Sequence, residues 1–249
     1  MTAGHILLLA AAGFGAGLSG SLAGLASLFS YPALLAVGLP PIVANMTNTV
    51  ALLFSSIGSV ASSRPELTGQ WPTIRRYGLF IALFGGAGAA LLFLTPPGGF
   101  EKVVPFLVGG ASVVLLLQPR IRAAAAEGSH RQGPLLWVGL AAVGVYAGYF
   151  GAAAGVLLLA LLMIGLPVSL LQANGLKNVL LGVANGIAAL AFAIFGPVDW
   201  VAMAPVAVGV LIGSSLGPVL ARRLPADALR IGIALAGIGL AVKLALDAF

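Results

Sequence analysis

Long apolar stretches follow one another along this chain, separated by short segments that carry most of its charge. Most of them suit the roughly 20 residues that a helix needs to cross the hydrocarbon core of a bilayer. Two stretches are too long for one crossing, because a continuous helix over 134–166 would measure about 50 Å against a core of about 30 Å. The stretches are 4–38, 41–62, 74–95, 100–118, 134–166, 168–195, 198–221 and 226–247.

The composition fits a chain that folds inside a membrane. Apolar residues make up 60% of the 249 positions and charged residues only 7%, which leaves too little polar surface for a water-soluble body of this size. Nine of the twelve basic residues lie in three short loops beside apolar stretches, as topology signals do, so no nucleic-acid partner is expected. The N-terminal stretch lacks a basic leader and is expected to be a membrane element rather than a signal peptide.

Small residues interrupt both overlong stretches near the middle. The first contains the run Gly17–Gly24 and the second the run Gly144–Gly151. Glycine weakens a helix interior, so a break is expected at each run. We therefore predict that 4–38 and 134–166 are broken hairpins, each made of two shorter helices that enter the membrane and return to the same side.

The two halves of the chain also resemble each other. Pro32–Pro40 aligns with Leu159–Pro167 at an offset of 127, and Ala44 and Asn45 align with Ala173 and Asn174 at an offset of 129. The alignment predicts an internal repeat. The expected units are a first repeat over 1–122, a cytoplasmic linker over 123–133 and a second repeat over 134–249.

The loop arginines then indicate how the repeats are oriented. If each overlong stretch returns to its starting side, all nine arginines lie on one side of the membrane, which the positive-inside rule makes the cytoplasm. Each repeat then crosses an odd number of times, so the repeats are inverted and both termini face outward. We predict an all-α, polytopic protein of the cell membrane with two inverted repeats, each a re-entrant hairpin plus three transmembrane helices.

Two polar clusters lie deep in the apolar sequence at matched positions of the repeats. A charge at membrane depth costs roughly 2.5 to 3.5 kcal/mol on insertion scales, so the default interpretation of a buried lysine is a substrate pathway. The spacing i, i+3, i+4 places each cluster on one helix face. Two matched faces predict one shared site for a small anion. The clusters are Asn174, Lys177 and Asn178, and Asn45, Asn48 and Thr49.

Several runs of the chain, in order along nearly its whole length, resemble the TauE/SafE family of sulfite-exporter-like permeases. The resemblance implies a multi-spanning bacterial inner-membrane permease, and an exporter, for sulfur-containing anions such as sulfite or organosulfonates. The resemblance leaves the substrate open. The predicted inverted repeats favour transport by alternating access at a midplane site between them. The runs are Tyr31–Thr49, Tyr146–Gly151, Ala173–Asn178 and Gly213–Pro225.

The chemistry of an anion site extends these clusters to the hairpin breaks. The second half-helix of each hairpin is expected to begin inside the membrane, where its free N–H groups and positive dipole end face the cavity. Glycine allows close approach of an oxyanion, hydroxyl groups add donors, and the two tyrosines are expected to close the second break. The expected substrate-binding residues are Ser19, Gly20, Ser21, Asn45, Asn48, Thr49, Tyr146, Tyr149, Gly151, Asn174, Lys177 and Asn178.

Plainer roles compete with these assignments. Lys177 could snorkel to the cytoplasmic interface, and the asparagines and Thr49 could be interhelical contacts. Ser55, Ser56, Ser59 and Asn185 continue the same faces and are expected to pack helices rather than to contact a ligand. Close packing is also expected of Gly85, Gly86, Gly88, Gly213 and Gly217, and such glycine-rich faces permit a homodimer.

The sequence offers few residues for an enzyme, a proton relay or a metal site. The six acidic residues lie in loops or near the ends of stretches, so neither a buried proton relay nor an intramembrane enzyme is expected. The chain has no cysteine and its histidines, His5 and His130, are far apart, so no metal or other cofactor is expected. A channel stays open as an alternative, since a pore and a carrier can share one lining.

Overall fold

The computed structural model describes residues 1–96, 98–127, 133–220 and 226–248. Within these residues every regular element is an α-helix, as predicted. The ten helices are α1 Ala3–Ala23, α2 Ser27–Ala36, α3 Pro41–Ser62, α4 Trp71–Leu94, α5 Gly99–Glu127, α6 Pro134–Tyr149, α7 Ala154–Gly165, α8 Leu170–Phe195, α9 Trp200–Leu220 and α10 Ala226–Ala248.

The helices have the lengths of a polytopic membrane protein. Six of the described helices contain an apolar segment long enough to cross a bilayer, namely α1, α3, α4, α5, α8 and α10. Helices α2, α6 and α7 and the described apolar part of α9 are shorter. The predicted fold class, all-helical and multi-spanning, is confirmed.

Both overlong stretches are broken into two helices. The first break falls at Gly24–Ala26, between α1 and α2, and the second at Phe150–Ala153, between α6 and α7. Gly24 and Gly151 have φ of 73° and 77°, a left-handed conformation that glycine adopts without strain. They are 127 residues apart, which is the offset of the repeat.

The first break lies later than the sequence predicted. Ser19, Gly20 and Ser21 were expected at the start of the second half-helix, but they lie in the last turns of α1. That expectation was wrong because a glycine-rich run can continue as helix when tertiary contacts support it. Helix α5 also exceeds its predicted stretch and continues through Pro119 to Glu127, over alanines that favour helix.

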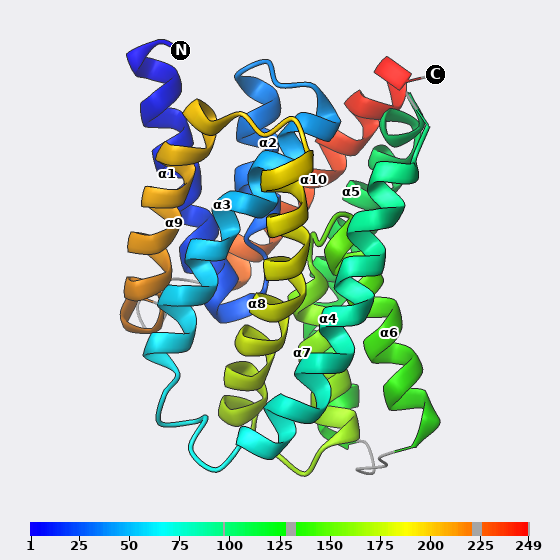
Figure 1. The fold of residues 1–249 in the computed structure, drawn as a ribbon. Coiled ribbons are helices and arrows are strands. Elements are labelled where there is room, and N and C mark those ends of the chain that lie inside the picture. The colour runs from blue at the N-terminus through cyan, green and yellow to red at the C-terminus, as the bar shows by residue number, and fades with distance from the viewer. Residues whose placement is uncertain (97, 128–132, 221–225, 249) are drawn as a thin grey trace.

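The arrangement of the helices corresponds between the two halves. Helix α1 packs on α9 as α6 packs on α4, α3 contacts α9 as α8 contacts α4, and α2 contacts α10 as α7 contacts α5. The N- and C-termini lie at one end of the bundle, and the segment joining α3 to α4 lies at the other end (Figure 1). This correspondence is what an internal repeat predicts.

Glycines allow the closest of these pairs to form. A Cβ atom at Gly148 would overlap the carbonyl oxygen of Gly85 in the α4–α6 pair, and one at Gly17 would overlap the Val210 carbonyl in the α1–α9 pair. Gly88 and Gly213 make similar backbone contacts, so close packing at these predicted positions is confirmed. These faces, which the sequence suggested as surfaces for a homodimer, are occupied inside the chain.

Helices α3 and α8 run antiparallel through the middle of the bundle (Figure 1). Asn178, near the start of α8, lies beside Ser63 at the end of α3, and Gly182 meets Ser56 one turn further along. When two equivalent helices pack antiparallel, residues at matched positions lie side by side only near the middle of the helices. Matched residues near the helix ends lie at opposite ends of the pair. The site described next lies along this pair.

Candidate functional site

A small polar cavity lies between α3 and α8, where both hairpin breaks approach them. Its volume of about 60 Å³ has room for a few water molecules or one small oxyanion. None of its lining side chains is ionisable. The lining residues are Gly20, Gly24, Ala26 and Ser27 from the first hairpin, Leu52, Ser55, Ser56 and Ser59 from α3, Gly151 and Gly155 from the second hairpin, and Asn178, Leu181 and Asn185 from α8.

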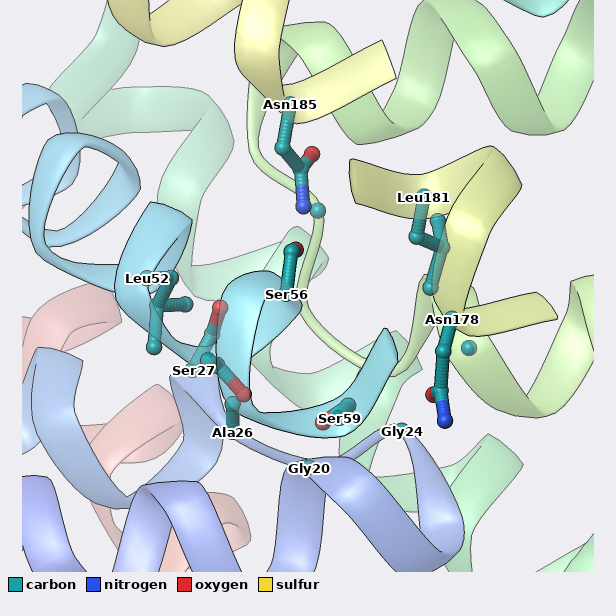
Figure 2. A pocket seen from close by; sticks show the side chains of 13 residues that line it. Gly20, Gly24, Ala26, Ser27, Leu52, Ser56, Ser59, Asn178, Leu181 and Asn185 are labelled. Carbon is teal, nitrogen blue, oxygen red and sulfur yellow. The ribbon is translucent and has the colours of Figure 1, made fainter. Parts of the chain in front are cut away.

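The helical period explains why the cavity is polar on two sides. Ser55, Ser56 and Ser59 lie within one face of α3 at spacing i, i+1, i+4. Asn178 and Asn185 are seven residues apart, two turns along one face of α8. Figure 2 shows both asparagines projecting from α8 beside the serines of α3, with Gly20 and Gly24 below them.

The two hairpin breaks meet at this cavity. A Cβ atom at Gly24 would overlap the Gly155 backbone, and a Cβ atom at Gly155 would overlap Gly24. Helices α2 and α7 both start here, since Ala26 and Ser27 begin α2 and Gly155 is the second residue of α7. Neither start has a side-chain cap, so the positive ends of two helix dipoles adjoin the cavity.

Lys177 is fully buried, with none of its surface exposed, and it lies directly behind the cavity wall. Its Nζ atom is 3.5 Å from the carbonyl oxygen of Gly20, in the last turns of α1. A cation at a helix C-terminus offsets the negative end of the dipole. The snorkelling interpretation is therefore wrong. Lys177 does not line the cavity itself; its ammonium group lies behind Gly20, which does.

Asparagines cap the first half-helix of each hairpin from the opposite half of the chain. Asn174 of α8 donates to the Ser21 carbonyl at 3.3 Å, and Asn45 of α3 donates to the Tyr149 carbonyl at 2.9 Å. The Oδ1 atoms of both side chains are buried without a hydrogen-bond partner in the described structure. These matched residues therefore hold the breaks in place, and neither lines the cavity.

The two polar clusters do not form one shared site, contrary to the prediction. Eighteen residues of α3, at 1.5 Å each, separate Asn45 from Ser63, a rise of about 27 Å. Asn178 hydrogen-bonds to Ser63 at 3.5 Å, so its cluster lies at the far end of α3 from Asn45. The reason is the antiparallel packing of α3 and α8, which sends matched positions near the helix starts to opposite depths.

Asn48 and Thr49 make structural contacts. Asn48 accepts from Ser30 Oγ at 2.5 Å and donates to Ser27 Oγ at 3.2 Å, which ties α3 to α2. The Thr49 hydroxyl donates to the Asn45 carbonyl within α3 at 2.9 Å. The interhelical interpretation thus fits Asn48, which reaches the cavity only through Ser27.

The tyrosines brace the second break. Tyr146 Oη donates to the Ala152 carbonyl at 2.6 Å, and Tyr149 Oη lies 3.2 Å from Thr95 Oγ1. Neither residue lines the cavity. The hydroxyls of Ser19 and Ser21 are used inside α1, where they donate to the carbonyls of Ala16 and Leu18.

Of the twelve predicted residues, Gly20, Gly151 and Asn178 line the cavity, and Lys177 adjoins it. Sequence reasoning assigned Ser55, Ser56, Ser59 and Asn185 to packing, and it did not consider Gly24, Ser27 or Gly155. One signal was available. Ser56 and Asn185 are matched at the offset of 129 and lie near the middle of their helices, where antiparallel packing brings equivalent positions together.

Within the described part of the chain, no three histidine or acidic side chains are grouped so that they could hold a metal ion. The donors at the cavity are hydroxyls, amides and backbone N–H groups, which suit an anion. No curated protein and no solved structure matches the chain. The profile described as "Sulfite exporter TauE/SafE" matches residues 9–244, nearly the whole chain. The chain therefore belongs to the TauE/SafE family of sulfite exporters, a family of membrane transporters and not of enzymes.

Proposed function

We propose that this chain exports small sulfur-containing anions, such as sulfite or organosulfonates, across the cell membrane and binds them in the cavity between α3 and α8. Membership of the family makes it a membrane transporter. The observation that supports this site is the meeting of two uncapped helix N-termini, those of α2 and α7, at one cavity. Backbone N–H groups at a helix start can bind an anion. The N–H groups of Leu28, Phe29, Ala154 and Val156 donate to local carbonyls, and those of Ser27 and Gly155, both lining residues, have no such bond in the described structure.

The electrostatics around the cavity also favour an anion. Each helix start contributes a partial positive charge of about half a unit. The negative end of α1, at Gly20, is offset by Lys177, the only charged residue on α8. With no carboxylate in the lining, an anion entering the cavity meets hydrogen-bond donors and no like charge.

The transport cycle that we propose is alternating access between two inverted repeats. The hairpins α1–α2 and α6–α7 correspond in the two halves and meet tip to tip at Gly24 and Gly155. Movement of one repeat against the other can then open the cavity to one side at a time. We place the loop containing Arg64 in the cytoplasm and both termini outside, as the positive-inside rule indicates.

Purified protein in proteoliposomes tests this function. We expect radiolabelled sulfite uptake that saturates with concentration and is accelerated by unlabelled sulfite on the opposite side. Saturation and counter-transport are properties of a carrier, because one site must be reset before the next cycle. Saturable flux without counter-transport would favour the channel alternative, and flux no greater than in protein-free liposomes would contradict both.

A further inference from the structure

We infer that the cavity selects singly charged oxyanions, so that sulfite is carried as hydrogen sulfite and not as the doubly charged ion. The inference rests on the proposed function, because it concerns the same cavity. Three observations support it: the fixed charge around the cavity, its small volume, and an amide oxygen that faces it.

The fixed charge around the cavity is small. The lining residues come from α1, α2, α3, α7, α8 and the two breaks. Among these helices, α8 carries Lys177 and α1 carries His5, which lies fifteen residues before Gly20 at the far end of the helix; α2, α3 and α7 carry no acidic or basic side chain. Helix α4, which also packs on α8, carries Arg75 and Arg76 in its second turn, and the Arg76 guanidinium lies 5.0 Å from the Trp137 ring. After α3, Glu66 packs beside Gly175 near the start of α8.

The charge of Lys177 and the dipole ends of the four helices at the two breaks together amount to about one positive unit. Lys177 contributes one unit, and the starts of α2 and α7 contribute about half a unit each. The C-terminal ends of α1 and α6, at the same two breaks, each subtract about half a unit. The total balances one negative charge on the ligand and leaves a second one without compensation.

Desolvation sharpens this preference. The cavity has a volume of about 60 Å³, so an oxyanion that fills it exchanges part of its hydration shell for contacts with the protein. The cost of moving an ion out of water grows with the square of its charge, so a dianion costs about four times as much as a monoanion of the same size.

The hydrogen-bonding capacity of the lining also suits a protonated ligand. The Oδ1 atom of Asn185, a lining residue, is buried without a hydrogen-bond partner in the described structure, so it is left as an acceptor. Ser27 Oγ already accepts from Asn48, so its hydroxyl is left to donate. An oxyanion that carries one proton can accept from Ser27 and donate to Asn185, whereas a fully deprotonated one leaves the amide oxygen unpaired.

Flux measured across neutral pH tests the inference, because sulfite passes there from the hydrogen-sulfite monoanion to the dianion. At fixed total sulfite, with equal pH on both sides of the proteoliposome, we expect flux to follow the monoanion and to fall about tenfold per pH unit once the dianion dominates. Methanesulfonate, singly charged at every pH used, is the control, and its flux should stay constant. Sulfate, doubly charged throughout, should not compete with sulfite.

A variant separates the contribution of the amide acceptor from that of the charge around the cavity. Asn185→Ala removes the acceptor, and we expect it to reduce sulfite flux at low pH about tenfold, with a smaller loss for methanesulfonate, which has no proton to donate. Sulfite flux that stays level or rises with pH, or competition by sulfate equal to that by methanesulfonate, would overturn charge selection and leave the transport function standing. Absence of saturable flux for sulfite and methanesulfonate at every pH would overturn the proposed function and the inference with it.

Discussion

Replacing Lys177 with methionine is expected to lower sulfite flux about a hundredfold, because a unit charge near the site is worth about 2 to 3 kcal/mol at the effective dielectric of a protein interior. Without the ammonium group, the carbonyl end of α1 at Gly20 presents an uncompensated negative dipole to the entering anion. The measurement is initial flux in proteoliposomes at matched protein density.

The substitution should leave the fold intact. The Gly20 carbonyl keeps its hydrogen bond from the Gly24 backbone N–H at 3.0 Å, and methionine has a volume close to that of lysine without a charge to desolvate. Lys243→Met is the matched control, since that lysine is exposed near the C-terminus. If a folded Lys177→Met protein transports sulfite at the wild-type rate, Lys177 does not contribute to anion binding.

Gly155→Ala is the second substitution for which a large effect is expected, a loss of most flux. The added Cβ atom would overlap the Gly24 backbone, so the tips of the two hairpins cannot keep their contact and the starts of α2 and α7 cannot converge. Overpacking of this kind costs about 1 to 3 kcal/mol, which should lower the unfolding temperature by a few degrees. Flux and thermal unfolding are measured on the same preparation.

Gly110→Ala provides the control for Gly155→Ala. A Cβ atom at Gly110, within α5, meets no heavy atom within 4 Å, so this variant should transport and unfold like the wild type. If Gly155→Ala also transports at the wild-type rate, the contact between the hairpin tips is not needed for the cycle.

Much of the fold could be predicted because its causes are local. The lengths of the apolar stretches set the number of spans, and the runs Gly17–Gly24 and Gly144–Gly151 marked both broken hairpins. The exact position of the first break could not be predicted. Several glycines in that run fit a helix or a turn equally well, and only the contact of Gly24 with Gly155, in the other half of the chain, distinguishes one of them.

The site was harder to predict, because depth in the membrane depends on how the repeats pack. Asn45 and Asn174 match in sequence, and both cap a hairpin, yet α3 and α8 place them at opposite depths. The cavity instead uses Ser56 and Asn185, a pair whose polarity alone is equally typical of helix packing. Residue type indicated the chemistry, while the antiparallel pairing decided which residues share a cavity.

Calorimetric titration of sulfite into purified wild-type and Ser56→Leu protein tests the location of the binding site most directly. Ser56 lines the cavity, and leucine at this position fills much of its volume of about 60 Å³. Ile57→Leu, at the neighbouring position and 61% exposed, is the control. We expect saturable binding by the wild type and the control and none by folded Ser56→Leu. Equal sulfite binding by folded Ser56→Leu would contradict the assignment of the cavity as the anion site.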